Sequence, residues 1–457
     1  MIFLNPFIHK QQEITSPDAI QSGQPSKAIS RRKLLSTLGA AGIALAAGET
    51  FLTGSSAQAA SASTTIYNVK EFGARGNSRY DQDDTPFIQN AIDSAAQTGG
   101  IVFIPAGMYF LQTPLRLSSN ITLMGSGSNS ILHAAMNKIS VLNGSAVNQV
   151  HIHRLSFQGL GSFASNSMPL IECGISLTKA TNIRITDCLF SMIDNGVKSI
   201  DSSGVVVDNC FFDGIIGALD YDNQGYGIWC NNGNDHTLVN NRFTMMYQSC
   251  ITLLNGSSHA IIANNHIQKS YQSGIDLSSG AKEEPCQFNI IRDNTIEGLV
   301  NSSGNKGYTF GIRLRGGCIS NLITGNILND IDDQAITLEG TGDAKKNRPQ
   351  ANTLTDNQIS SIRDKGVVLI NAYSNRVSNN LIRNCKGDGI LLSSKGKDEW
   401  SYCDNNHLVT NSITNCSGAP LRIADASCRE TIIYGNIGSG NTEKLIDKGT
   451  NTNTAAL

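Results

Sequence analysis

An apolar-x-apolar triplet, most often opened by glycine, recurs along the chain from residue 174 onward. Successive copies start 22 to 37 residues apart. They read GISL at 174, GVKS at 196, GIWC at 227, CITL at 250, GIDL at 274, GIRL at 311, AITL at 335, GVVL at 366, GILL at 389 and PLRI at 420. The alternation has the period of two that belongs to β-strands, whereas a helix would repeat every 3.6 residues.

A second signature, an asparagine or aspartate shortly before apolar positions, occurs once in each unit. It stands at Asp187, Asn209, Asn241, Asn265, Asn294, Asn326, Asn357, Asn380, Asn411 and Asn436. A unit of 22 to 24 residues with three short strands, lengthened by insertions, is typical of one coil of a parallel β-helix. We therefore predict an all-β solenoid of about ten or more coils. Stacked side-chain amides would hydrogen-bond from each coil to the next.

Ahead of the regular coils, the pattern changes to that of one short helix. Thr85 is the expected cap, Pro86 suits the first helical position, and Gly99 ends the segment. One face is apolar, with Phe87, Ile88, Ala91, Ile92 and Ala95. We expect this helix to cover the open end of the coil stack.

Composition narrows the classes of partner. The 457 residues are 16% charged with a net charge of -2, so no nucleic-acid partner is indicated. Eleven cysteines occur without a CxxC motif or zinc-ligand spacing. Cys188 and Cys210 occupy equivalent places one coil apart, as do Cys385 and Cys416. We expect stacked, buried thiols, although such neighbours are also close enough for disulfide bonds.

The N-terminal segment is expected to direct export rather than to fold with the coils. Ser30, Arg31, Arg32 and Leu35 match the pattern S-R-R-x-x-L ahead of an apolar run, which resembles a twin-arginine signal. The run is too short to span a bilayer. We predict a signal at 1–59, an N-terminal cap with the first coils at 60–135, a β-helix at 136–440 and a tail at 441–457. The mature protein would be periplasmic or extracellular.

Four motifs between residues 66 and 125 carry a family resemblance. FGARGN, DDT, IQNAID and GGIVFIPAGMY resemble the N-terminal signature of the pectate lyase superfamily, shared with polygalacturonase-like glycoside hydrolases and phage tailspikes. The resemblance implies a right-handed parallel β-helix that is active on carbohydrate. It leaves the reaction open, because this scaffold hosts lyases, hydrolases, epimerases and adhesins.

By the same resemblance, substrate would lie along the sheet formed by the triplets, whose variable positions point outward. Down the stack these are Ser176, Lys198, Trp229, Thr252, Asp276, Arg313, Thr337, Val368, Leu391 and Arg422; two residues further on, the outward set includes Asn231, Ser278, Arg315 and Glu339. Charged and aromatic members gather in the middle third. We predict catalytic roles for Asp276, Arg313 and Glu339, and substrate binding by Lys198, Trp229 and Arg315.

Several reactions are compatible with these outward-facing residues. A lyase needs a base and a cation beside a uronate carboxylate, which Asp276 and Arg313 could supply. Calcium held by Asp276 and Glu339 is an alternative way to neutralise that carboxylate. A hydrolase needs two carboxylates about 5 to 9.5 Å apart, and Asp332 with Asp333 resembles a polygalacturonase pair one residue out of register.

Other interpretations of the same residues also remain open. The pairs Asp276–Arg313 and Arg315–Glu339 could be plain surface salt bridges. A non-catalytic glycan-binding protein and a uronan epimerase also remain open. The predicted partner is a polysaccharide, and the oligomeric state is left open.

Overall fold

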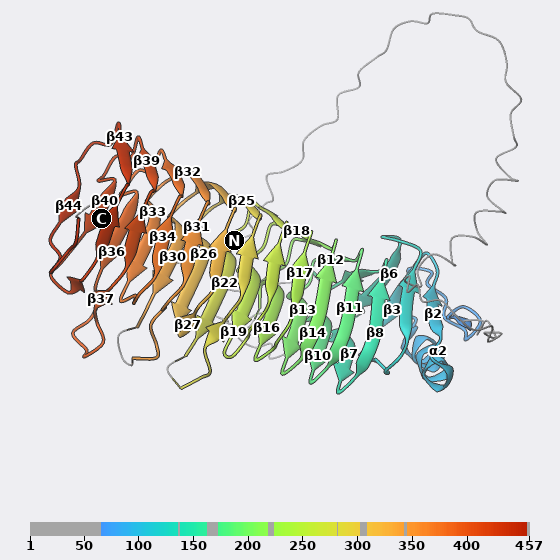
Figure 1. The fold of residues 1–457 in the computed structure, drawn as a ribbon. Helices are drawn as coiled ribbons and strands as arrows, with labels where there is room; N and C mark the ends of the chain where they lie inside the picture. Colours follow the sequence, from blue (N-terminus) through green and yellow to red (C-terminus); the bar gives the residue numbers. More distant parts are fainter. Residues whose placement is uncertain are drawn as a thin grey trace, which may run out of the picture. The chain divides into compact units, whose positions relative to one another are not determined.

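The structure, a computed structural model, describes residues 65–135, 138–161, 172–217, 224–280, 282–301, 309–341 and 345–454. The predicted export signal lies outside these ranges. The described residues belong to one unit, Ser63–Leu457, in which short strands stack in parallel into three long sheets (Figure 1). The predicted right-handed parallel β-helix is confirmed.

Sheet I has fourteen strands and follows the triplet sheet along the chain. Its strands, in order, are β1 (Ile66–Asn68), β2 (Ile101–Ile104), β5 (Thr122–Gly125), β8 (Asn148–His153), β11 (Thr181–Thr186), β14 (Ser203–Asp208), β17 (Thr237–Val239), β20 (Ile261–Ala263), β24 (Ile290–Arg292), β28 (Leu322–Thr324), β31 (Thr353–Thr355), β34 (Arg376–Ser378), β38 (His407–Val409) and β42 (Ile432–Tyr434).

Sheet II has thirteen strands and contains the triplets. Its strands are β4 (Leu115–Arg116), β7 (Ser140–Ser145), β10 (Cys173–Thr178), β13 (Asn195–Ile200), β16 (Tyr226–Asn231), β19 (Ser249–Leu254), β22 (Ser273–Ser279), β26 (Phe310–Gly316), β30 (Gln334–Glu339), β33 (Lys365–Ile370), β36 (Ile390–Ser393), β40 (Leu421–Ile423) and β44 (Ile446–Asp447). Strand β44 lies within the predicted tail and pairs with β40.

Sheet III also has thirteen strands. They are β3 (Gly107–Leu111), β6 (Ser130–Ala134), β9 (Ser156–Gln158), β12 (Leu189–Ser191), β15 (Phe211–Asp213), β18 (Arg242–Thr244), β21 (His266–Gln268), β25 (Thr295–Leu299), β29 (Ile327–Ile331), β32 (Gln358–Ile362), β35 (Leu381–Arg383), β39 (Ser412–Thr414) and β43 (Ile437–Ser439). Two short pairs, β23 (Cys286–Gln287) with β27 (Cys318–Ile319) and β37 (Cys403–Asp404) with β41 (Cys428–Arg429), extend the turns.

The core is a column of like residues stacked coil upon coil. Phe190 and Phe212 stack with ring centroids 4.7 Å apart, and Phe212 stacks on Phe243 at the same distance. These distances equal the spacing of paired strands, about 4.8 Å. A Cβ atom on Gly196 would lie only 2.5 Å from the Phe212 ring. Glycine opens the triplet there because the backbone approaches the aromatic column so closely.

The predicted asparagine ladder is confirmed from Asn241 to Asn436. Each side-chain amide donates to the side-chain carbonyl of the next coil, for example Asn294 Nδ2 to Asn326 Oδ1 at 3.0 Å. The placement of Asp187 and Asn209 in this ladder is wrong, because Cys188 and Cys210 take that position. Asp187 and Asn209 instead adopt the left-handed conformation just before it. Asparagine and aspartate tolerate that conformation better than most residues.

A second ladder, absent from the sequence prediction, links Asn289, Asn321, Asn352, Asn375 and Asn406 in the turns between sheets II and I. All eleven cysteines are buried and none forms a disulfide bond. The expected stacking of thiols also applies to the pairs formed across β23/β27 and β37/β41, Cys286 with Cys318 and Cys403 with Cys428.

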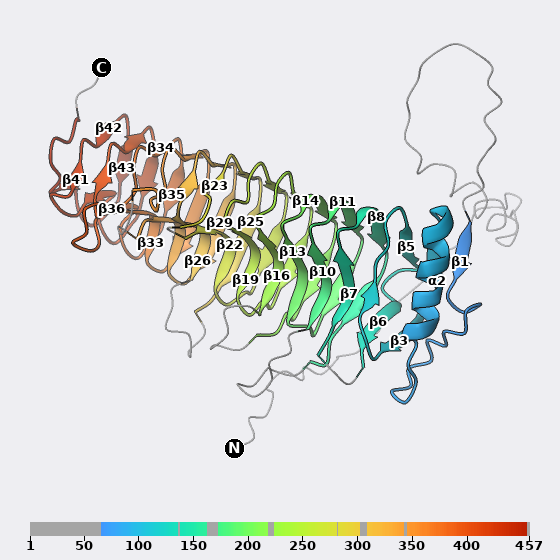
Figure 2. The same cartoon turned by 90° about the horizontal axis from the view of Figure 1, so that it is seen from below.

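Helix α2 (Thr85–Thr98) packs against β1, β2 and β4 at the N-terminal end of the stack (Figure 2). Gly99 ends it in the left-handed conformation, as predicted. The expected cap, Thr85, is wrong: Asp84 is the N-cap residue. The Asp84 carboxylate accepts hydrogen bonds from the backbone of Arg75 and Gly76 instead. In the described ranges, no helix is both long and apolar enough to cross a membrane.

Candidate functional site

The variable positions of the triplets form one continuous row across sheet II. Register pairs link Ser176, Lys198, Trp229, Thr252, Asp276, Arg313, Thr337, Val368, Leu391 and Arg422. The second outward set is also in register, through Asn231, Leu254, Ser278, Arg315 and Glu339. The isoleucines and leucines between them are buried, so the row faces away from the core.

The middle of this row is shielded from solvent. Asp276 is only 6% exposed and Thr252 only 2%, whereas Lys198, Trp229 and Arg313 are partly exposed. Asp276 is therefore not a solvated surface residue. Burial of a carboxylate is costly unless a partner compensates for it.

Arg313 on β26 is that partner. Its Nε donates to Asp276 Oδ1 at 3.1 Å and its Nη2 to Oδ2 at 2.5 Å, so both carboxylate oxygens are occupied. The Phe310 ring lies 4.8 Å from the guanidinium carbon and covers it. Nη1 of Arg313 has no hydrogen-bond acceptor among the described residues. The pair is a bidentate ion pair between a buried carboxylate and a partly exposed guanidinium, with one nitrogen left to bind another group.

The electrostatic surroundings keep Arg313 protonated. Burial acts to lower its pKa, but the charges of Asp276, Glu339 and Tyr226 raise it, and the net effect is a raised pKa. Arg313 is therefore suited to binding an anion rather than to accepting a proton. The contribution of Tyr226 also means that this phenol lies within electrostatic reach of the guanidinium.

Lys198 and Trp229 are neighbours at the N-terminal side of the pair. Lys198 Nζ lies 4.8 Å from the centroid of the Trp229 ring. Trp229 pairs in register with Thr252, which in turn pairs with Asp276. The predicted binding residues thus lie on the same row as the ion pair, two or three strands away.

Arg315 and Glu339 are in register but do not form the surface salt bridge that was the alternative to a functional role. Glu339 Oε1 lies 3.8 Å from Lys395 Nζ, and the ion pairs between described residues do not include Arg315. Glu339 and Asp276 are two strands apart and two positions out of line. This offset corresponds to about 12 Å between backbones.

Asp332 and Asp333 hold a turn rather than a substrate site. Asp332 Oδ2 accepts the backbone N–H of Asn301 at 2.6 Å. Asp333 Oδ2 accepts the backbone N–H of Thr309 at 2.6 Å and the Asn301 amide at 3.1 Å. The polygalacturonase-like pair is therefore engaged within the protein, by these contacts and by the Arg363 side chain, which binds Asp332 Oδ1.

Two aromatic residues of the site, Tyr226 and Phe310, were missed by the sequence prediction. Each comes directly before the glycine that opens a triplet, at the start of its strand. A Cβ on Gly227 or Gly311 would strike core atoms, so the glycine faces inward. The residue before the glycine then faces outward. A sequence search that included the residue before each opening glycine would have identified both aromatic residues.

A buried carboxylate cluster stands at the edge of sheet II, just before β10 and β13. Lys138 Nζ lies 3.0 Å from both carboxylate oxygens of Asp194, and Asp194 Oδ2 accepts the backbone N–H of Glu172. Burial raises the pKa of Glu172 to about 7, against the opposing hydrogen bond from the Leu160 backbone. Burial also raises the pKa of Asp194. Glu172 is thus poised to change its charge near neutral pH.

Calcium does not fit the predicted ligands. Arg313 occupies both oxygens of Asp276, and Glu339 lies two strands away. Within the described ranges, no group of three or more histidine, cysteine, aspartate or glutamate side chains is arranged to hold a metal ion.

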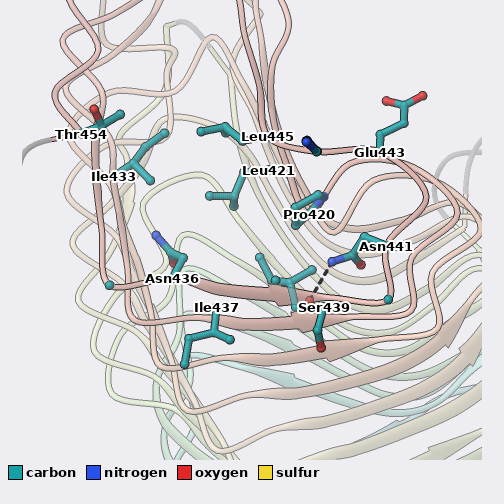
Figure 3. A pocket seen from close by; sticks show the side chains of 15 residues that line it. Pro420, Leu421, Ile433, Asn436, Ile437, Ser439, Asn441, Glu443, Leu445 and Thr454 are labelled. Atoms are coloured by element: carbon teal, nitrogen blue, oxygen red, sulfur yellow. Dashed lines mark hydrogen bonds between the residues drawn. The ribbon is translucent and has the colours of Figure 1, made fainter.

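The cavities that lie away from the row include these two. The first, about 460 Å³, is at the C-terminal end of the stack, where Leu421, Ile433 and Ile437 surround it (Figure 3). Its one carboxylate, Glu443, is bound to Arg422. The second, about 230 Å³, lies between the turns that follow β30 and β36.

Two family models match successive parts of the chain. One, described as rhamnogalacturonase A/epimerase, pectate lyase-like, matches residues 66–276. The chain is a parallel β-helix protein whose residues 66–276 are similar to the pectate lyase-like family. The other model, described as periplasmic copper-binding protein (NosD), matches residues 280–455. The boundary between the two matches falls just after Asp276.

Several known proteins are also similar to this chain. Alginate lyase 7 of Azotobacter vinelandii is 41% identical over 69 residues, which is 13% of this chain and 8% of the relative's length. The A-module of a mannuronan C-5 epimerase from Azotobacter vinelandii has a TM-score of 0.57 at 16% identity, covering 86% of this chain and 100% of that one. A family 28 exopolygalacturonase of Yersinia enterocolitica has a TM-score of 0.54 at 14% identity, covering 86% and 79%. At these identities the structures show the shared fold.

Proposed function

We propose that the protein is an exported carbohydrate-active enzyme that removes the proton next to the carboxylate of a uronate residue in a glycan. The observation that carries this proposal is the partly exposed Arg313, fixed by the buried Asp276 and offering Nη1 on the outward face of sheet II. Export rests on the signal-like segment at 1–59 and on the match to a family described as periplasmic.

The chemistry begins with the substrate carboxylate. Arg313 binds it through Nη1 and neutralises its charge, which makes the adjacent C5 proton more acidic. Asp276 holds the guanidinium in place and so acts as a positioning residue. Tyr226 is the candidate to take the proton, because its phenol interacts electrostatically with Arg313 across the two strands, β19 and β22, that lie between β16 and β26.

The fate of the resulting carbanion sets the product. Expulsion of the glycosidic oxygen at C4 forms a C4–C5 double bond and breaks the chain, which is a lyase reaction. Return of a proton to the opposite face of C5 inverts that carbon and leaves the chain intact, which is an epimerase reaction. Both share the first step at Arg313 and Tyr226.

Hydrolysis is less well supported by the geometry. It requires two carboxyl groups about 5 to 9.5 Å apart, one able to donate a proton. Asp276 has both oxygens bound to Arg313, and Glu339 is offset by two strands. Trp229 and Lys198 remain in the proposal as a ring surface and a cation for neighbouring sugars.

A second candidate is a protein that binds acidic glycans without altering them. The occupied state of Asp276 favours it, because a fixed ion pair can hold a carboxylate without taking part in proton transfer. In that case the same row would bind a uronate through Arg313, and substrate chain length and stereochemistry would stay unchanged.

The test is incubation of residues 60–457 with polymannuronate, polygalacturonate and a neutral glucan. Ultraviolet absorbance of unsaturated uronate reports elimination, NMR reports inversion at C5, and reducing ends without unsaturation report hydrolysis. Arg313→Lys and Tyr226→Phe should each lower turnover by on the order of 100-fold or more. Arg376→Lys, an exposed arginine on sheet I, is the matched control.

The outcomes separate the candidates. Reducing ends without unsaturation would refute the proposed chemistry in favour of hydrolysis. Binding of uronates with none of the three signals would leave the non-catalytic candidate. Full activity in Arg313→Lys would move the site away from this row.

A further inference from the structure

The cavity of about 230 Å³ between the turns after β30 and β36 has no place in the chemistry described above. Its lining residues are Lys345, Arg348, Gln350, Tyr373, Trp400 and Asp404. Parallel β-bridges join Gln350 to Tyr373 and Tyr373 to Asp404 on successive coils. The backbone beside the cavity is therefore held by hydrogen bonds between coils. None of the six belongs to the Lys198–Glu339 row of sheet II.

Two aromatic side chains with cations beside them face this cavity. Lys345 Nζ lies 5.8 Å from the Trp400 ring centroid, and the guanidinium carbon of Arg348 lies 5.4 Å from that of Tyr373. Tyr373 is 39% exposed, which leaves ring surface accessible. Aromatic rings beside cations provide both an apolar face and charge for an anionic ring compound.

Arg348 is the fixed cation of the cavity. It is only 4% exposed, its Nε donates to the Asn371 carbonyl at 3.0 Å and its Nη2 to the Tyr402 carbonyl at 2.6 Å. No acceptor for its Nη1 exists among the described residues. A buried guanidinium held by two carbonyls with an unused nitrogen is a preformed anion site.

The local charge also favours an anion. Asp404 lies 3.7 Å from Arg348 Nη2, but its two oxygens are already bound by Arg429 at 3.1 and 2.9 Å. The cavity lining therefore has two cations, Lys345 and Arg348, and one carboxylate, Asp404, which is already paired with Arg429 outside the lining. The Tyr402 ring lies 3.7 Å below the Arg429 guanidinium and holds it in place.

We propose that this cavity is a second glycan site, which binds one uronate residue with its carboxylate on Arg348 and Lys345 and its ring against Trp400 and Tyr373. Its volume is below the roughly 300 to 1,000 Å³ of sites for drug-sized ligands, which fits a single sugar ring. The uronate assignment rests on the proposed function. A second point of attachment raises the apparent affinity for long chains by making the second binding step intramolecular.

The chain offers a clean reporter, because it contains only two tryptophans, Trp229 and Trp400. In the Trp229→Phe protein, all indole fluorescence comes from Trp400. Titration with trigalacturonate or trimannuronate should give a saturable change in this fluorescence. Maltotriose at the same concentrations should give none.

Substitutions of cavity residues test whether the change in Trp400 fluorescence arises from binding in the cavity. Lys345→Ala and Tyr373→Ala, each made in the Trp229→Phe protein, should weaken the uronate titration at least tenfold. Tyr434→Ala, which removes a similarly exposed tyrosine from β42, is the matched control and should not alter it. Circular dichroism of each variant checks the fold. An equal response in Tyr373→Ala and Tyr434→Ala would overturn the assignment.

Three further results would overturn the proposal: no response to either uronate trimer, an equal response to maltotriose, or an equal response to sodium sulfate. Failure of the proposed function gives a different outcome. If no glycan is altered by the protein while the Trp400 titration still saturates with uronate, the enzyme proposal fails and the second site stands. Turnover in the outward row without a Trp400 response would do the reverse.

Discussion

Replacing Glu172 by glutamine should remove a pH-dependent cost from the stability of the protein. Glu172 is fully buried, accepts hydrogen bonds from the Leu160 backbone, and lies beside Asp194. Glutamine keeps an oxygen that can accept the Leu160 bond but cannot ionise. The substitution therefore isolates the effect of the buried negative charge.

The magnitude follows from the pKa of Glu172, which burial raises from 4.5 to about 7. At about 1.36 kcal/mol per pH unit, this corresponds to about 3 kcal/mol. Between these two values the native state holds a proton that the unfolded state has released. Stability in this window therefore falls as the pH rises. The free energy of unfolding of Glu172→Gln, relative to the parent protein, should rise by about 3 kcal/mol between about pH 4 and about pH 8.

Urea unfolding of both proteins, followed by circular dichroism across this range, measures the difference directly. Carboxylates that do not interact with Glu172 cancel in the comparison. Glu283→Gln, which removes an exposed carboxylate from a surface turn, reports the general cost of losing one charge. A difference between Glu172→Gln and parent that stays constant with pH would refute the reasoning.

Further predictions concern the core, the ladder and the thiols. Phe212→Ala removes the middle of the phenylalanine column and should cost about 3 to 5 kcal/mol in urea unfolding; a cost no greater than that of Phe288→Ala, an exposed phenylalanine, would contradict the stacked core. Asn326→Ala leaves two donors of Asn294 unpaired and should cost about 2 kcal/mol or more, and a neutral effect would argue against the ladder. The eleven buried cysteines should react with a thiol reagent only after denaturation, so fast labelling of native protein would disprove their burial.

The fold was predictable because each coil repeats the same requirements. Period-two triplets marked the strands of sheet II, and the glycine at 196 reflects close contact with the Phe212 ring. Once the triplets were aligned, the lateral neighbours of Asp276 and Arg313 followed from backbone pairing. Register in a parallel sheet depends on the backbone, so sequence spacing was sufficient.

The failures concern features that spacing does not determine. Asp187 and Asn209 were placed in the ladder because left-handed turn positions and ladder positions favour the same residue types. The burial of Asp276 depends on how neighbouring side chains cover it, and the amino-acid sequence does not reveal this. The Arg348 cavity joins turns from different coils, and turns vary in length and composition.

The positions of Asp276 and Arg313 show how the solenoid treats chain length. They are 37 residues apart, whereas Thr252 and Asp276 are 24 apart, yet both pairs sit on adjacent strands of one sheet. Strand separation is set by backbone hydrogen bonds and does not depend on the connecting turn. Insertions can therefore reshape the walls beside the outward row while its internal distances stay constant. Such modularity lets the surface beside the outward row change through turns alone, while the row itself keeps its register.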